Sequence, residues 1–423
     1  MLEIQHIRLN KDAVIEGLKK RHFDAELIIA EILSEDEKWR LSKTEKENLT
    51  SKMNQLSKQI GSLFKEGKQD EANSLKAKTA ELKQKESELK KSVAVFEKKI
   101  ADLMYQLPNV PNELVKKGQS EQDNEIIEEH GKHPEFDFTP VPHWELADNY
   151  GLIDFEAGVK ITGAGFPVYK AKAAKLQRSL ISFFLDEAEN AGYEEFIPPL
   201  VVNEASAYGT GQLPDKDGQM YYIPEEDLYL IPTAEVPLTN IYRDVMFPDS
   251  DFSIKITGYT PCFRREAGSY GAEVRGLNRL HQFDKVEIVR IENPDNSEKA
   301  LNEMIDHVKG LLQKLGLQYR VLRLCAGDTG FAASMTYDFE VYSVAQKKWL
   351  EVSSVSRFDS FQSTRLKLRF KNAEKKSQMC HTLNGSALAL PRIVAALLEQ
   401  GQSLTGIEIP KVLHRYTGFT RID

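Results

Sequence analysis

The sequence has few cysteines and no long apolar run. Its 423 residues include three cysteines, Cys262, Cys325 and Cys380, which lie far apart in the chain. This number and spacing argue against a disulfide framework and against a zinc site, and they fit a reducing compartment. No segment approaches the ~20 apolar residues of a membrane-spanning helix, and the first residues lack a basic segment followed by an apolar one. We therefore expect a cytoplasmic protein that makes no use of a membrane.

Two common nucleotide-binding motifs are missing as well. The segment that runs from Gly61 to Gly67, Lys68 and Gln69 has five residues between its glycines and ends in glutamine, so it is not a P-loop. Gly163-Ala164-Gly165 lacks the third glycine and the strand–helix setting of a dinucleotide site. These absences exclude two large classes of nucleotide-binding protein.

The charge of the chain is unevenly distributed. The net charge of −8 argues against nucleic acid as a partner, but the distribution of charge matters more than its sum. Between Lys52 and Lys99 there are twelve basic and seven acidic residues, a local charge of +5, which leaves −13 for the rest of the chain. One segment is therefore suited to a polyanionic partner.

The same segment has the periodicity of a coiled coil. Mostly apolar residues recur at steps of three and four in two series, Leu49, Met53, Leu56, Ile60 and Leu63, then Leu75, Thr79, Leu82, Glu86, Leu89, Val93, Phe96, Ile100, Leu103 and Leu107. A polar break separates the series, which predicts an antiparallel helical hairpin over about 34–107, with arms of about 50 Å. A dimerising coiled coil or a spacer is the alternative, and the basic excess favours RNA. Prolines 108 and 111 end the second helix, so we place a domain boundary near 110 and expect domains at 1–110 and 111–423.

The C-terminal part predicts an α+β domain. An amphipathic helix is expected over 171–191 and another over 295–315. Short strands are expected over 318–324, 337–344, 349–353 and 366–370, and a final strand and helix over 383–400. Strands outnumber helices and lack regular helical crossovers, which favours an antiparallel sheet with packed helices.

One strand–loop–strand passage, residues 254–289, has an unusual series of polar side chains. Side chains alternate between the faces of a strand, so Arg264 and Glu266 are expected on one face, and Arg279, Phe283 and Glu287 on one face of the second strand. The latter three are spaced about 13 Å apart. Cation, aromatic ring and anion in this order suit a ligand with a phosphate, a flat ring and an ammonium group. A solvated hairpin with ordinary ion pairs is the alternative.

Three further segments have polar groups that could bind a ligand. Thr233 and Glu235 are expected on one strand face, where they could hold an ammonium group, although capping would also explain them. Glu351 and Ser354 offer oxygen ligands of the kind that Mg²⁺ takes beside nucleotide phosphates, unless they form a surface strand end. Pro391 suits the first turn of a helix and puts Arg392 where anions are favoured, unless Arg392 forms a surface ion pair.

Taken together, these segments resemble the seryl-tRNA synthetases, a family of class II aminoacyl-tRNA synthetases. The run Phe263-Arg264-Arg265-Glu266-Ala267-Gly268-Ser269-Tyr270, followed by Arg275-Gly276-Leu277 and His281-Gln282-Phe283, resembles motif 2 of the family. Residues 209–214 with Thr233-Ala234-Glu235 are similar to its serine-binding loop, and residues 382–392 resemble motif 3. Residues 192–202 are similar to motif 1, which builds the dimer interface of class II enzymes, and the helical hairpin resembles the arm that clasps tRNA(Ser).

The resemblance implies a fold and an activity. It implies a class II catalytic domain with an antiparallel sheet, preceded by the coiled-coil hairpin, that acts as a homodimer. Such an enzyme activates L-serine with ATP and Mg²⁺ to seryl-adenylate and transfers serine to tRNA(Ser), and also to tRNA(Sec). A ligase that charges a carrier protein and a non-catalytic RNA-binding relative are the alternatives.

The resemblance also implies roles for individual residues. The catalytic residues would be Arg264 and Arg392. The serine site would comprise Thr233, Ala234, Glu235, Arg264, Glu287, Asn384 and Ser386. The ATP site would comprise Arg264, Arg265, Glu266, Arg279, Phe283, Glu351, Val352, Ser353, Ser354 and Arg392, and Glu351 with Ser354 would bind Mg²⁺.

The chain departs from the family pattern in two places. Residues 356–365 read Ser-Arg-Phe-Asp-Ser-Phe-Gln-Ser-Thr-Arg, where members usually have Ser-Asn-Cys-Thr-Asp-Phe-Gln-Ala-Arg-Arg or close to it. In motif 3, Ala387 and Pro391 replace the usual glycines. These changes leave each proposed contact residue in place.

Overall fold

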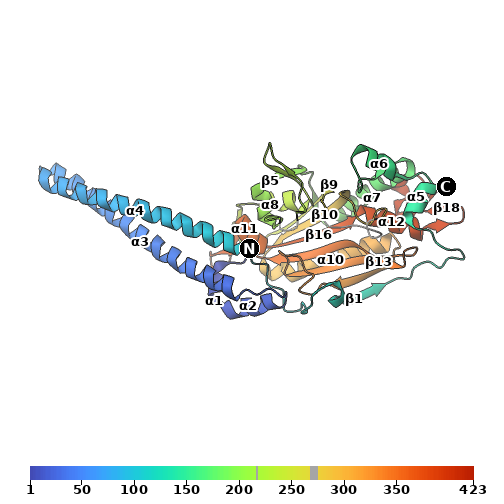
Figure 1. Cartoon of the computed structure of the whole chain (residues 1–423), viewed down its shortest axis with the longest axis horizontal. Coiled ribbons are helices and arrows are strands. Elements are labelled where there is room, and N and C mark those ends of the chain that lie inside the picture. The colour runs from blue at the N-terminus through green and yellow to red at the C-terminus, as the bar shows by residue number, and fades with distance from the viewer. Residues whose placement is uncertain (216–217, 267–274) are drawn as a thin grey trace. The chain divides into compact units, whose positions relative to one another are not determined.

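The protein is described by a computed structural model that covers residues 1–215, 218–266 and 275–423 (Figure 1). Ala267, Gly268, Ser269 and Tyr270 of the run that resembles motif 2 lie outside the described residues. The chain forms two compact units. One unit comprises Leu2–Lys19 and Phe23–Pro108, and the other comprises Met1, Lys20–His22 and Asn109–Asp423.

The first unit consists of helices, two of them long. Its helices are α1 (Ile4–Leu9), α2 (Lys11–Lys19), α3 (Glu26–Lys65) and α4 (Gln69–Met104). Helix α3 begins eight residues before the predicted start of the hairpin, because Ile29 and Ile32 extend its buried stripe toward the N-terminus. At 1.5 Å per residue α3 is about 60 Å long and α4 about 54 Å. The predicted hairpin is confirmed, and the residues of the predicted seam are less exposed than their neighbours.

Polar contacts join the first half of α3 to the last part of α4. Trp39 Nε1 donates a hydrogen bond to Glu97 at 3.0 Å, and Lys99 Nζ lies 3.1 Å from the buried carboxylate of Glu35. These pairs fix the antiparallel register of α3 against α4, with residue numbers that sum to about 135 across the seam.

The second unit is built on an eight-stranded sheet. In spatial order its strands are β1 (Glu125–His130), β11 (Tyr319–Arg323), β12 (Met335–Ser343), β13 (Lys348–Asp359), β16 (His381–Ala389), β10 (Gln282–Glu292), β9 (Ser253–Phe263) and β4 (Glu194–Glu195). Neighbouring strands are antiparallel except for β4 and β9, which are parallel. The predicted α+β class is confirmed.

Further helices and small sheets surround this sheet. The helices are α5 (His143–Asn149), α6 (Phe155–Ile161), α7 (Ala171–Asn190), α8 (Glu204–Thr210), α9 (Glu235–Asn240), α10 (Ser297–Lys314), α11 (Phe361–Leu366), α12 (Leu390–Gln400) and α13 (His414–Thr417), with 3₁₀ turns at Glu121–Asp123, Pro294–Asn296 and Lys411–Leu413. The short strands are β2 (Ile153–Asp154), β3 (Val168–Tyr169), β5 (Val201–Asn203), β6 (Tyr222–Ile223), β7 (Leu228–Leu230), β8 (Met246–Phe247), β14 (Arg369–Lys371), β15 (Ser377–Met379), β17 (Gln402–Ser403), β18 (Gly406–Glu408) and β19 (Arg421–Ile422). No helix of the described residues is apolar over a length sufficient to cross a membrane.

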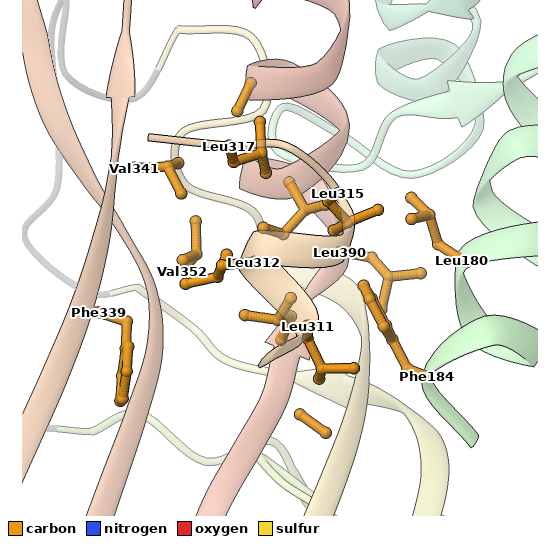
Figure 2. Packing of buried hydrophobic residues seen from close by; sticks show 14 of the residues in the cluster. Leu180, Phe184, Leu311, Leu312, Leu315, Leu317, Phe339, Val341, Val352 and Leu390 are labelled. Atoms are coloured by element: carbon orange, nitrogen blue, oxygen red, sulfur yellow. The ribbon is translucent and has the colours of Figure 1, made fainter. Parts of the chain in front are cut away.

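The main hydrophobic core lies between α7, α10 and α12 and one face of the sheet (Figure 2). Helix α10 contributes Leu311 and Leu312, which lie among side chains of α7, α12, β12 and β13 in this view. Side chains alternate between the two faces of β10, and Val286 and Ile288 on one face belong to this core. Lys285 and Glu287 therefore face the opposite side, where the functional site lies.

Several predicted strands end earlier or later than expected. Strand β9 ends at Phe263 and β10 begins at Gln282, so Arg264, Glu266 and Arg279 lie in the connecting segments and the predicted strand faces do not apply to them. Glu266 has φ of +46°, a left-handed conformation that a strand cannot contain. Strand β13 runs six residues beyond the predicted end at Ser353, because its pairing with β12 and β16 continues that far.

The prediction that Thr233 and Glu235 share a strand face is wrong. Strand β7 ends at Leu230, and Glu235 is the first residue of α9. The Glu235 N–H donates a local hydrogen bond to Thr233 Oγ1 at 3.2 Å, while the N-cap of α9 is Ala234 and has no side-chain capping bond. The two side chains are nevertheless close together and buried.

Candidate active site

A cavity of about 630 Å³ lies on the face of the sheet opposite the main core. Of the residues predicted for the site, those that line it are Thr233, Glu235, Arg264, Glu266, Arg279, Phe283, Glu351, Val352, Ser353, Ser354, Asn384, Ser386 and Arg392. They come from β10, β13, β16, the start of α9 and α12, and the segments that follow β9 and precede β10. Residues more than 150 positions apart in the chain therefore line the same cavity.

Arg264 and Phe283 both line this cavity and contact each other. The Arg264 guanidinium stacks over the Phe283 ring at 5.3 Å, and its Nε donates to the Pro232 carbonyl at 3.3 Å. The Arg264 backbone is fixed by two bonds to His281: its N–H donates to the His281 carbonyl at 2.9 Å, and its own carbonyl contacts His281 Nδ1 at 3.1 Å. A cation and an aromatic face are thus held side by side, as the binding of a phosphate next to a flat ring requires.

A second pair of charges lies beside them. Arg279 Nη1 and Glu266 Oε2 form an ion pair at 2.8 Å that joins the segment after β9 to the segment before β10. Because the Arg279 side chain is 48% exposed, this pair contributes little to stability. Its position in the wall of the cavity makes a ligand-binding role for both side chains possible.

Arg392 is held at the start of α12. The helix has a proline at its first turn, as predicted from Pro391. The Arg392 guanidinium donates to the Asn278 carbonyl at 2.9 Å and to the Glu351 carbonyl at 2.6 Å, and it lies 3.6 Å from the Glu351 carboxylate. These contacts orient an arginine whose position next to a helix N-terminus favours anions.

Carboxylates gather near Glu351. Asp338 lies opposite Ser354 in the register of β12 and β13. Burial and the nearby Glu351 raise the pKa of Asp338 well above its ordinary value, although a hydrogen bond from Ser354 lowers it. One oxygen of Asp338, Oδ1, is buried and has no hydrogen-bond partner among the described residues. A cation bound next to Glu351 would therefore favour the ionised form of Asp338.

The residues predicted as Mg²⁺ ligands fit such an ion. No group of three or more His, Cys, Asp or Glu side chains suitable for a metal occurs in the described parts of the chain. Mg²⁺ beside a nucleotide needs only one or two protein oxygens, since phosphates and water complete its octahedral shell. Glu351 and Ser354 line the cavity and supply such oxygens, whereas Asp338, opposite Ser354 on β12, is not among the lining residues.

The floor of the cavity is a buried polar cluster around Glu287. Its carboxylate accepts hydrogen bonds from Thr233 Oγ1 at 3.1 Å and from Asn384 Nδ2 at 2.9 Å, and it forms an ion pair with Lys285. Lys285 Nζ also donates to Thr233 Oγ1 at 2.9 Å. Glu287 itself is fully buried and does not line the cavity, so it acts on a ligand through its neighbours or after a rearrangement.

Glu235 has an unusual environment at the same end of the cavity. Burial, and then the charge of Glu287, raise the pKa of Glu235 to about 7. Gln362 Nε2 donates to Glu235 Oε1 at 2.6 Å and to the Thr210 carbonyl at 3.0 Å, while Gln362 Oε1 accepts from Thr382. Lys285 and Arg264 both favour the ionised form of Glu235, but they do not offset its burial.

Two other predicted residues do not reach the cavity. Ala234 is fully buried in a small hydrophobic cluster with Leu238, Ile256 and Val289. Arg265 points elsewhere, since its guanidinium lies 5.7 Å from the Tyr221 ring and it is not among the lining residues. Side chains at 264 and 265 diverge because neighbours in an extended segment point in opposite directions.

Several polar residues of the site were not predicted: Gln362 contacts Glu235, and those that line the cavity are Thr210, Gln212, Asn278, Lys285, Asp328, Thr336 and Ser356. Lys285 lines the cavity at the period-two position between Phe283 and Glu287, and a charged residue inside an otherwise buried strand was the available signal. Gln362 donates to Glu235, and its signal was that Gln362 keeps the family pattern, with Ser356, Phe361 and Arg365, within a segment that otherwise departs from it.

Comparisons with known proteins agree with this geometry. Residues 1–111 match the seryl-tRNA synthetase N-terminal domain, and residues 221–401 match the class II tRNA synthetase core domain (G, H, P, S and T). A serine–tRNA ligase from Salinibacter ruber is 50% identical over 100% of this chain and 99% of its own length, and one from Akkermansia muciniphila is 45% identical over 99% and 98%. A crystal structure of seryl-tRNA synthetase from Pyrococcus horikoshii, complexed with ATP, is 33% identical with a TM-score of 0.91, covering 100% of this chain and 99% of that one.

Proposed function

This chain belongs to the seryl-tRNA synthetases of class II, and from that premise we propose how its cavity divides between substrates. The activity is that of a serine–tRNA ligase. ATP would occupy the part lined by Arg264, Phe283, Arg279 and Arg392. Serine would occupy the end lined by Thr233, Glu235 and Asn384.

The proposed arrangement for ATP follows from charge and shape. Arg264 would bind the α-phosphate and the serine carboxylate, and Phe283 would stack on the adenine, with Glu266 accepting from its amino group. Arg279 and Arg392 would bind the β- and γ-phosphates. Val352 and Ser353 would complete the wall of the site, and Glu351 with Ser354 would hold Mg²⁺, which neutralises phosphate charge when bound. Ala234 and Arg265, which do not reach the cavity, would act only through the backbone conformation of their segments.

The proposed arrangement for serine places its ammonium group near Glu235 and Thr233. Its hydroxyl group would be recognised by the polar cluster of Glu287, Asn384 and Ser386. Such a site rejects alanine, because the buried polar groups would otherwise be left without partners. Glu287 would contribute by holding Thr233 and Asn384 in place.

The chemistry requires positioning more than acid–base catalysis. The serine carboxylate is ionised near pH 7, so it can attack the α-phosphorus of ATP without a general base. A bond from carboxylate oxygen to phosphorus forms, and the bond to the bridging oxygen of pyrophosphate breaks. Arg264 would stabilise the charge that develops on the α-phosphoryl oxygens. Arg264 and Arg392 are accordingly the proposed catalytic residues.

The observation that carries this proposal is the stacking of Arg264 over Phe283 within one cavity. Arg264→Ala should lower serine-dependent ATP–pyrophosphate exchange by about 10²-fold or more, because a preorganised cation next to the reacting phosphate is lost. Circular dichroism should show a folded protein. The matched control is Arg369→Ala, on β14 outside the cavity, which should exchange normally. Equal activity of the two variants would contradict the assignment.

The remaining assignments are also proposals. The helical domain, residues 1–110, would bind tRNA(Ser), and residues 111–423 would form the catalytic domain of a cytoplasmic homodimer. Serylation of tRNA(Sec) is proposed on the same basis, and a charging assay with tRNA(Sec) transcript in place of tRNA(Ser) tests it directly.

A further inference from the structure

A buried histidine and a buried glutamate lie outside the proposed substrate contacts. His143, the first residue of α5, and Glu399, near the end of α12, both have side chains with no exposed surface. His143 Nδ1 lies 2.9 Å from Glu399 Oε1, and the His143 N–H donates to the same oxygen at 3.1 Å. Ser343 and the Ala345 N–H donate to the other carboxylate oxygen. The negative charge of Glu399 is therefore well compensated, and nothing in this pair contacts the cavity directly.

The second nitrogen of the His143 ring has a different partner. The Leu277 N–H donates to His143 Nε2 at 2.9 Å. Because a backbone N–H can only donate, Nε2 is the accepting nitrogen and Nδ1 carries the ring proton, which it donates to Glu399. Glu399 thus fixes the tautomer in which His143 can accept from Leu277.

Leu277 begins a segment that forms part of the cavity wall. Leu277, Asn278, Arg279 and Leu280 all line the cavity. The segment has no regular secondary structure of its own, so its position depends on such side-chain contacts. The turn before it is packed tightly on the histidine: Gly276 has φ of +67°, and a Cβ added there would lie 2.4 Å from His143 Nε2.

A second path leads from the same glutamate to the same segment. Gln346 Nε2 lies 3.4 Å from Glu399 Oε1, and Gln346 Oε1 accepts from Asn278 Nδ2 at 3.0 Å. The Asn278 carbonyl in turn accepts from Arg392. Glu399 therefore supports Leu277 through His143 and Asn278 through Gln346, on either side of one peptide bond.

We propose that His143 is a positioning residue for ATP, which acts by accepting the Leu277 N–H and so holds the segment that carries Arg279 against the cavity. The inference rests on the proposed function, in which this part of the cavity binds ATP. It predicts an effect on the use of ATP and none on the use of serine, whose proposed contacts lie on other elements.

Two amide substitutions separate the two hydrogen bonds of the ring. Asparagine places an amide where His143 Nδ1 lies, so His143→Asn keeps a donor for Glu399 and loses the acceptor for Leu277. Glutamine reaches farther, so His143→Gln places an oxygen where Nε2 lies and keeps the acceptor for Leu277. In the full-length protein, we expect His143→Asn to raise the KM for ATP in serine-dependent pyrophosphate exchange about three- to tenfold, the usual effect of losing one hydrogen bond. His143→Gln should remain within about twofold of wild type.

The outcomes distinguish this inference from a purely structural role and from the proposed function. If both variants raise the KM for ATP equally, or if the KM for serine rises with it, His143 does not position the ATP segment. If the wild-type protein shows no serine-dependent exchange, the proposed function fails instead. His307→Gln, at a half-buried histidine of α10 outside the cavity, is the control and should leave both KM values unchanged.

If His143→Gln does not fold, Gly276→Ala tests whether the contact between His143 and the Leu277 segment matters for ATP. The added methyl group would displace the turn from His143 Nε2 while Glu399 keeps its bond to the ring. A raised KM for ATP with an unchanged KM for serine supports the proposal, and unchanged values for both substrates overturn it.

Discussion

Glu235 shows how the environment of one side chain can make substrate binding depend on pH. Its carboxyl group is buried at one end of the cavity, close to the charge of Glu287, and its pKa is raised from 4.5 to about 7. A carboxylate that is only partly ionised at neutral pH binds an ammonium group less well as the pH falls. The nearby Gln362, which donates to Glu235, favours the ionised form but does not offset the burial.

The KM for serine should therefore rise as the pH falls through 7. Between pH 7.5 and pH 6 the ionised fraction of a group with a pKa of about 7 decreases about eightfold, and the KM for serine should increase by a similar factor. Pyrophosphate exchange at saturating ATP and varied serine concentration measures this KM. Glu235→Gln should have a high KM for serine that does not vary over this range. A wild-type KM that stays constant would show that Glu235 does not bind the ammonium group.

The same shift has a consequence for stability with the opposite pH trend. Because the folded-state pKa lies above the unfolded value, the folded protein binds more protons between pH 4.5 and 7, and its stability decreases as the pH rises through this window. The loss amounts to about 3 kcal/mol. Urea unfolding at pH 5 and pH 8 should show this loss in the wild type and not in Glu235→Gln.

At the residue scale, the sequence was sufficient to predict which side chains share the site wherever a motif specifies both a residue and its neighbours. Arg264, Phe283 and Arg392 were predicted to share a site, and they line one cavity. The burial of Glu287 beneath that cavity could not be predicted, because alternation gives the face of a strand and not the depth of a side chain. Lys285 was missed because a charged residue in a strand is usually expected to be exposed. Its burial depends on contacts with Thr233 and Glu287 that only the fold reveals.

At the scale of elements, periodicity predicted the helices well and the strand ends poorly. The seam of α3 and α4 repeats over many turns, so a single local exception does not obscure it. The ends of β9 and β10 depend instead on where pairing stops, at Phe263 opposite Gln282. The turn between β7 and α9 was mistaken for a strand because Thr233 and Glu235 also fit the alternation of a strand.

The register of the long helices allows the proposed tRNA-binding role to be tested by shortening them. Removing residues 46–89 and joining the ends with a short Gly-Ser turn keeps the pairs Trp39 with Glu97 and Glu35 with Lys99. Pyrophosphate exchange should remain within about twofold of wild type, because the cavity residues all lie in the other compact unit. Charging of tRNA(Ser) should fall by about 10²-fold or more, because many phosphate contacts would be lost.

A charge variant of intact length serves as the control for this deletion. Lys76, Lys78, Lys83 and Lys85 are exposed on α4 and lie outside the seam. Their replacement by glutamine should leave the helices folded, raise the KM for tRNA(Ser) and reduce its dependence on salt. If exchange and charging decrease together in the shortened protein, the long helices have a structural role and not a tRNA-binding one.

At the scale of the whole molecule, the fold class followed from the sequence but the strand order did not. The lack of helical crossovers indicated an antiparallel sheet, yet β1 pairs with β11 and β16 lies between β13 and β10, which are long-range neighbours. Such pairing joins segments that lie far apart in the chain, and a single sequence contains no direct sign of it.

The proposed homodimer should depend on the segment that resembles motif 1. Ile197 is 90% exposed in this single chain, immediately after the parallel pairing of β4 with β9. We expect Ile197→Asp to shift the protein from dimer to monomer in analytical ultracentrifugation, because a charge would be buried without a partner at the interface. Leu9→Asp, at a residue that is 75% exposed in the other unit, should leave the mass unchanged. A wild-type protein that sediments as a monomer would refute the proposed assembly.

The carboxylates in and next to the cavity have a thermodynamic consequence for the protein as a whole. Glu235 lies near Glu287, and Asp338 lies near Glu351; burial first, and then the charge of the neighbouring carboxylate, raises the pKa values of Glu235 and Asp338. Any ligand that brings an ammonium group to one pair and a divalent cation to the other removes the repulsion while it forms its own contacts. Substrates should thus stabilise this protein against heat more strongly than their size would suggest, since a bound substrate also removes the repulsion between these carboxylates.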